Sequence, residues 1–113
     1  MGEARSWTLE AAQQMFPEVR ERTERAVGET ESLMAKRDAL PVEAPERAGV
    51  DERIQQVVQR WAREMEALGL EVRGLWLVDF DSGSGFYCWK WPEESLEYFH
   101  GYEEGFAGRI RIQ

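Results

Sequence analysis

Apolar residues recur at alternating steps of three and four between positions 9 and 40. This spacing places them on one stripe of an α-helix and predicts a helix over residues 7–40. Thr8 suits the N-cap, because its hydroxyl can accept a hydrogen bond from an early backbone N–H. Pro17 lacks a backbone donor, so we expect either a kink near residues 13–16 or the start of a second helix.

A second stretch with the same spacing predicts a helix over residues 51–68. Asp51 can cap its start, and Gly69 suits its C-terminal stop. Residues 41–49 hold Pro41, Pro45 and Gly49, which favours a loop between two antiparallel helices. The apolar set of the second helix is Ile54, Val57, Val58, Trp61, Met65 and Leu68.

The pattern changes to a period of two after residue 74. Residues 75–80 and 86–91 are apolar and aromatic, which is typical of strands, and residues 81–85 have the composition of a turn. Pairing Asp81 with Phe86 places Asp79 and Cys88 side by side on one face. A slip of one residue would instead put Lys90 among the aromatic side chains, so we favour the first register.

Shorter elements surround this hairpin. Residues 70–73 can form a strand, and residues 109–113 alternate as a closing edge strand. Residues 93–100 fit a helical turn or an irregular strand equally well, and glycines make 101–108 a loop. The predicted class is α+β: one domain, residues 1–113, with a long antiparallel helical hairpin, then a small antiparallel sheet (a hairpin plus a C-terminal strand) over 70–113.

Charge and composition narrow the functions. The chain has 113 residues and a net charge of −8, which disfavours binding to nucleic acid or to an anionic membrane surface. It has no apolar run of the ~20 residues that cross a bilayer and no signal-peptide core. Its single cysteine cannot form an internal disulfide, so we expect a cytoplasmic protein.

Asp79 stands out because it interrupts an apolar strand, and a buried carboxylate needs a partner. The cationic candidates are His100 and Arg109. The favoured interpretation is a structural Asp79–Arg109 ion pair that ties the tail to the hairpin. The functional alternative is that Arg109, with backbone amides at Gly105 and Gly108, holds a small anionic ligand.

A metal or a nucleophile is not expected. Glu97 and His100 form a single Glu-x-x-His, whereas di-iron bundles use two such motifs plus further glutamates. These two residues are therefore the candidates for metal binding, but we predict no metal and no cofactor. Cys88 is interpreted as a small buried hydrophobe, since a neighbouring Asp79 carboxylate would raise the pKa of its thiol.

Several short motifs are shared with a known family. They are Trp7–Ala12 (WTLEAA), 16–19 (FPEV), 77–80 (LVDF), 88–89 (CW), 99–100 (FH) and 105–109 (GFAGR). They resemble an uncharacterised prokaryotic family, domain of unknown function 2203. The chain departs from it at Phe99, where the family often has tryptophan, and at Asp81, where it often has proline. The resemblance implies a fold and a site location, with no activity attached.

These observations favour a non-enzymatic cytoplasmic homodimer with an aromatic-lined pocket for a partner or small ligand. The dimer is expected because a helical seam of coiled-coil type and a sheet with two apolar faces exceed what one helical hairpin can cover. The alternative is a small enzyme that uses Asp79 and His100 as an acid–base pair. The predicted ligand-binding residues are Asp79, Trp89, His100, Gly105, Phe106 and Arg109.

Overall fold

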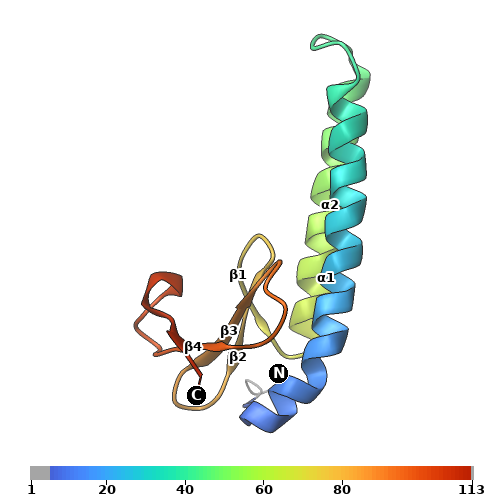
Figure 1. Ribbon diagram of the computed structural model, residues 1–113. Coiled ribbons are helices and arrows are strands. Elements are labelled where there is room, and N and C mark those ends of the chain that lie inside the picture. The colour runs from blue at the N-terminus through green and yellow to red at the C-terminus, as the bar shows by residue number, and fades with distance from the viewer. Residues whose placement is uncertain (1–5, 113) are drawn as a thin grey trace.

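A computed structural model of the chain describes residues 6–112, in which two helices are followed by an antiparallel sheet (Figure 1). The predicted α+β class, a helical hairpin followed by a small sheet, is confirmed. The helices are α1 (Leu9–Asp38) and α2 (Glu46–Ala67). The strands are β1 (Glu71–Gly74), β2 (Leu77–Asp81), β3 (Phe86–Lys90), β4 (Tyr98–His100) and β5 (Ile110–Arg111), with a 3-10 turn, η1 (Phe106–Gly108).

Helix α1 starts and bends as the sequence indicates. The Thr8 hydroxyl accepts a hydrogen bond from the Ala11 backbone N–H at 3.0 Å, so Thr8 is the N-cap. Pro17 lies inside one continuous helix, which rules out a second helix starting there. Figure 1 shows the first turns of α1, drawn in blue, leaning away from the axis of the rest, which agrees with a kink near the proline.

The predicted stripe of α1 is its buried face, and α2 lies alongside it for most of its length (Figure 1). A threonine in this stripe has a defined role. The Thr23 hydroxyl donates to the Val19 carbonyl at 2.8 Å and accepts from the Trp61 indole N–H at 2.8 Å. A polar residue is tolerated there because each of these buried polar groups has a hydrogen-bond partner.

Helix α2 begins at Glu46, five residues before the predicted start at Asp51. Arg47, in its first turn, donates to the carbonyls of Arg37 and Leu40 at 2.9 and 3.1 Å. This contact satisfies carbonyl groups at the end of α1 and favours a helix that reaches the loop. Asp51 therefore pairs with Arg37 at 3.1 Å from within α2 instead of capping it.

The sheet is a simple meander in the order β1-β2-β3-β4-β5. Asp81 pairs with Phe86 and Asp79 pairs with Cys88, which confirms the predicted register. Residues 93–100, which the sequence left open, contain the strand β4, and the expected edge strand is β5. Residue 113 lies outside the described residues.

Strand β2 begins at Leu77, two residues later than predicted, because residues 75 and 76 form the turn after β1. Trp76 adopts a positive φ of 59°, a conformation that costs energy for a residue with a Cβ. Its indole ring packs edge-on against Trp61 of α2, with ring centroids 4.9 Å apart. This tertiary contact offsets the local backbone cost.

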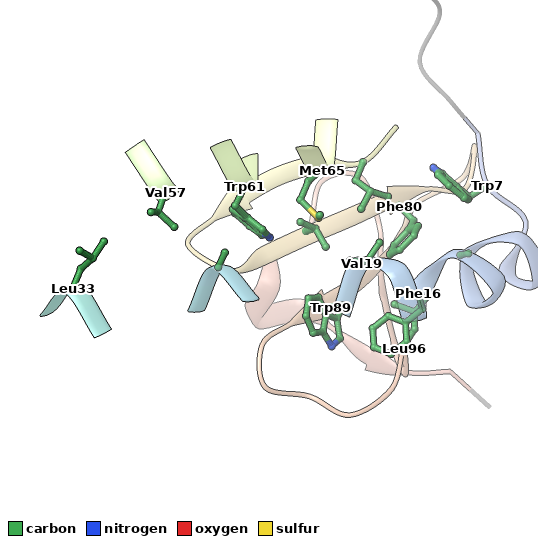
Figure 2. Packing of buried hydrophobic residues seen from close by; sticks show 14 residues of the cluster. Trp7, Phe16, Val19, Leu33, Val57, Trp61, Met65, Phe80, Trp89 and Leu96 are labelled. Atoms are coloured by element: carbon green, nitrogen blue, oxygen red, sulfur yellow. The ribbon is translucent and has the colours of Figure 1, made fainter. Parts of the chain in front are cut away.

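The helices cover one face of the sheet, and their contact forms the main apolar core (Figure 2). Figure 2 shows Phe80, Met65, Trp89 and Phe16 gathered where the sheet meets the helices. In Figure 1 the red C-terminal segment lies on the other side of the sheet from the helices. No helix within residues 6–112 has both the length and the apolar character needed to span a membrane.

Candidate functional site

Three polar side chains from adjacent strands converge on the sheet face that the helices leave open. Asp79 lies on β2, Cys88 opposite it on β3, and His100 on β4. Phe86 pairs with His100 and Cys88 pairs with Tyr98, so the period of two places His100 diagonally beside Cys88. Asp79 and Cys88 are each 1% exposed and His100 is 5% exposed. Their potential ligand atoms all lie within 4.8 Å of one another.

Asp79 and His100 contact each other directly. His100 Nε2 lies 3.2 and 3.1 Å from the two carboxylate oxygens of Asp79. His100 Nδ1 lies 2.9 Å from the Gly101 carbonyl, and a carbonyl can only accept, so Nδ1 carries a hydrogen. The imidazole orientation is therefore fixed from both sides. This result confirms that Asp79 is paired with a cation-forming group.

Arg73 supplies the second partner of Asp79. Its Nε donates to Asp79 Oδ2 at 3.1 Å, and its guanidinium lies 4.7 Å from the centre of the Phe86 ring. A second contact, at 2.8 Å, joins Arg73 to Glu71 on the same strand. The buried Asp79 carboxylate thus contacts Arg73 from the adjacent strand β1 and His100 from β4.

Cys88 is a free, buried thiol. Burial and, to a smaller extent, the Asp79 carboxylate raise the pKa of its thiol to about 12, although the Arg109 guanidinium acts in the opposite direction. A thiol with this pKa is a poor nucleophile at neutral pH, because thiolate is the reactive form. The interpretation of Cys88 as a buried, unreactive side chain agrees with this. Its position beside Asp79 follows from the predicted register, but the position of His100 next to both was not predicted from the sequence.

The three side chains form the floor of a pocket of about 400 Å³. Its other walls come from the C-terminal segment and from strand residues around the floor. The aromatic rings of Phe86 and Tyr102 meet edge-on at 5.1 Å, and the Tyr102 hydroxyl donates to Asp81 at 2.7 Å. Besides the floor residues, the lining consists of Arg73, Leu77, Phe86, Tyr102, Glu103, Glu104, Gly105 and Phe106.

Arg109 does not form the expected ion pair with Asp79. It binds the Glu93 carboxylate with both terminal nitrogens, at 3.1 and 2.7 Å. Its guanidinium also lies about 4 Å from the ring centres of Tyr98 and Phe106. The tail is therefore tied to the loop after β3, because Glu93 and the two rings offer a planar cation more contact than Asp79 does.

Two further site predictions also need correction. Trp89 lies on the helix-facing side of the sheet, fully buried against Phe16 at 5.3 Å, and does not line the pocket. Glu97 pairs with Arg111 at 2.7 Å and lies outside the Asp79–Cys88–His100 group. Because Glu97 precedes β4 and its carboxylate is paired with Arg111, it does not contribute a ligand beside His100.

Gly105 and Phe106, two of the predicted ligand-binding residues, line this pocket, whereas the sequence did not point to Arg73, Glu103 or Glu104. The alternation of Arg73 with Val72 on the first strand could have placed Arg73 on the same face as Asp79. This inference requires the register of β1 against β2, in which Glu71 pairs with Asp79. That register follows from the turn between Gly74 and Leu77, whose two central residues, Leu75 and Trp76, are not typical of turns.

Comparison with known proteins supports the resemblance of the short motifs. The family model described as an uncharacterized conserved protein, DUF2203, matches residues 5–112. No curated protein and no solved structure matches the chain. The matched region includes every strand that contributes to the pocket floor. The chain therefore belongs to the DUF2203 family of uncharacterized conserved proteins.

Proposed function

We propose that this protein is a non-enzymatic, cytoplasmic binding protein whose ligand carries positive charge and occupies the pocket beneath the C-terminal segment. The observation that carries the proposal is the pocket's composition: three carboxylates and one guanidinium line it, with Asp79 on its floor. Its volume of about 400 Å³ lies within the usual range of small-ligand sites.

The acids at the rim support a cation. Glu103 and Glu104 are exposed, and Glu103 forms no ion pair with any residue in the described part of the chain. Glu104 accepts a hydrogen bond from the Gly101 backbone N–H at 2.9 Å, which anchors the segment and leaves the carboxylate at the pocket. Carboxylates at the entrance of a recess raise the local concentration of cations.

The aromatic rings of the pocket also favour a positively charged ligand. Phe86, Tyr102 and Phe106 line the pocket, and the faces of such rings attract cations. The protein itself uses this attraction nearby, since guanidinium groups lie over Phe86 and Phe106. The walls therefore fit a compact cation better than an anion.

This proposal replaces the anionic ligand with a cationic one. Arg109, the residue expected to hold an anion, already binds Glu93 and is not part of the pocket lining. Arg73, the guanidinium in the lining, already pairs with Asp79 and Glu71. An anionic ligand would have to compete with these carboxylates.

Binding is favoured over acid–base catalysis for a geometric reason. A general base needs a free nitrogen or carboxylate oxygen within hydrogen-bond reach of the substrate. Both nitrogens of His100 are engaged, one with Gly101 and one with Asp79. An enzyme using this pair would first have to break one of these contacts.

The test is an NMR titration that follows the backbone amides of Gly101 and Gly105. We use tetramethylammonium, Zn²⁺ and inorganic phosphate as probes. The proposal expects at least one cation to shift both amides in a saturable way and phosphate to leave them unchanged. Saturable binding of phosphate, or no binding by any of the three, would overturn it.

A matched pair of variants checks the role of the rim. Combining Glu103→Gln with Glu104→Gln removes two negative charges at the pocket, and should weaken cation binding about three- to tenfold. Combining Glu43→Gln with Glu94→Gln removes two exposed charges that do not line the pocket. This control should bind the cation as the unmodified protein does.

The homodimer remains a prediction. The seam of α1 that suggested it is buried within the chain. Light scattering at high protein concentration tests it, and a monomer would contradict it. The large exposed hydrophobic side chains among the described residues lie on separate elements: Met34, Val42, Leu75, Tyr102, Phe106 and Ile110.

A further inference from the structure

The contact between His100 Nε2 and the Asp79 carboxylate depends on where the imidazole carries its hydrogens. Nδ1 carries a hydrogen, because it donates to the Gly101 carbonyl. In a neutral imidazole, Nε2 then presents its lone pair to the Asp79 carboxylate, only 3.1–3.2 Å away. Two electron-rich groups at this distance require a positive charge between them. Either a second ring proton or a metal ion can supply it.

A backbone carbonyl that receives the Nδ1 hydrogen is also the usual partner of a metal-binding histidine. It fixes the tautomer, orients the ring and makes Nε2 a better ligand. Asp79 is oriented in a comparable way, since Arg73 donates to Oδ2 at 3.1 Å and leaves Oδ1 less engaged. The supporting contacts of a metal site are therefore present around two of the three donors.

From this arrangement we infer that Asp79, Cys88 and His100 bind a single divalent transition-metal ion of the zinc type. This inference rests on the proposed function and specifies a metal ion as the cation that the pocket binds. The donor atoms, which are one nitrogen, one oxygen and one sulfur, lie within 4.8 Å of one another. In a tetrahedral zinc site with bonds of about 2.0–2.3 Å, neighbouring donors are roughly 3.3–3.7 Å apart. The Nε2-to-carboxylate distance nearly meets this spacing, and because no donor pair exceeds 4.8 Å, the other distances need to shorten by at most about 1 Å.

The donor types select the ion. Thiolate and imidazole ligands suit zinc and cobalt, whereas calcium and magnesium prefer sites made of oxygen atoms. Three protein ligands leave a fourth position, which is the arrangement of zinc sites that also bind water or a small molecule. Here the fourth position faces the pocket, so the bound ion would remain accessible from solvent.

The donors are held on strands, which limits their freedom. Asp79 and Cys88 are a directly opposed pair, and His100 is on the next strand. Adjacent strands lie about 4.8 Å apart, so three side chains on one face can share one ion without a change of backbone. The site thus needs only small side-chain rotations to close.

The test is a titration of the chelator-treated, full-length protein with Co²⁺, followed by absorption spectroscopy. The inference expects saturation at one ion per chain and a thiolate-to-cobalt charge-transfer band in the near ultraviolet. Zn²⁺ should displace the cobalt and abolish the band, and Ca²⁺ should not. Absence of one-to-one cobalt binding, or binding without the thiolate band, would overturn the inference.

Three variants locate the ion. Cys88→Ala and His100→Gln should each weaken Zn²⁺ binding by more than about a hundredfold, because losing a direct ligand costs more than losing a supporting contact. Glu97→Gln removes the acid that the sequence suggested as a ligand, and should leave Zn²⁺ binding unchanged. Near-ultraviolet circular dichroism checks that each variant is folded, and Cys88→Ala alone decides if His100→Gln does not fold.

The outcomes separate this inference from the proposed function. Binding of tetramethylammonium without binding of Co²⁺ or Zn²⁺ would overturn the metal site and leave the cation pocket standing. Binding of neither kind of cation would overturn both. Metal binding that persists in Cys88→Ala and His100→Gln would assign the ion to other residues and overturn the inference.

Discussion

The two faces of the sheet differ in role, although the same strands supply both: one face packs against the helices, and the other forms the pocket. On the helix-facing side Val78, Phe80 and Trp89 are fully buried among apolar neighbours. Their neighbours along the same strands, Asp79, Cys88 and Lys90, point to the other side. The first face stabilises the fold, and the second collects polar groups under a thin cover of loop and short strand.

The cover on each face explains the difference. Two long helices exclude water from the first face over a large area, so apolar burial is the main favourable term there. The second face is covered by the segment after β4, whose residues from Tyr102 to Gly108 are exposed. A thin cover leaves a recess, and polar side chains in that recess remain available to a ligand. The comparison predicts that substitutions on the first face affect stability most, and those on the second affect binding most.

The largest effect is expected for Trp89→Ala. The ring is fully buried and packs edge-on against Phe16 and Trp91. Its loss should lower the free energy of unfolding by about 3–5 kcal/mol, since a large cavity would remain. Urea denaturation followed by circular dichroism measures this value. A loss below about 1 kcal/mol would mean that the helix-facing side is not the stabilising one.

Asp79→Ala should lower stability less than Trp89→Ala does, and it should abolish cation binding in the pocket. Removal of the carboxylate leaves His100 Nε2 and Arg73 Nε without their polar partner. We expect a loss of about 1–3 kcal/mol, the usual cost of leaving a buried polar group without a partner. The same denaturation assay checks it, with the NMR titration as the second measurement. If this variant proves less stable than Trp89→Ala, the division between the two faces is wrong.

Cys88→Ala tests the pocket side with a residue that is nearly as buried as Trp89. The substitution removes one buried heavy atom, so we expect a loss of only about 0.8 kcal/mol. Thermal unfolding should shift little, whereas Zn²⁺ binding should be lost. A large destabilisation with unchanged Zn²⁺ binding would make the thiol a packing residue.

The smallest effect is expected for Glu29→Gln, which belongs to neither face. Glu29 on α1 pairs with Arg60 on α2 at 2.7 Å, and both side chains are about half exposed. Exposed pairs of this kind contribute about 0–1 kcal/mol, so the unfolding midpoint should change little in urea. A loss above that range would show that the helical hairpin depends on surface charge as well as on its buried seam.

Much of the fold could be predicted from periodicity. The stripe of α1, the stop at Gly69 and the pairing of Asp81 with Phe86 each follow from local spacing or from a residue with one favoured conformation. The start of α2 could not be predicted in this way. It depends on Arg47, whose guanidinium reaches carbonyls at the end of another helix.

The candidate site shows the same limit. Asp79 and Cys88 are close because they are opposed across one short turn, and the hairpin register predicts this. The contact of His100 with Asp79 was expected as one of two pairings, and the other, with Arg109, is wrong because Glu93 and two aromatic rings hold that guanidinium.

Spacing along the chain is enough to predict the helical hairpin, the register of the central strands and the separation of aromatic from polar side chains. These features depend on contacts between residues close along the chain, where spacing translates directly into geometry. The cationic partner of Asp79 and the way in which the C-terminal segment covers the pocket follow only from the folded arrangement. Those contacts join residues that are many positions apart, and several partners compete for each of them. Which partner forms the contact depends on how all the elements pack together, and this cannot be predicted from a local sequence pattern.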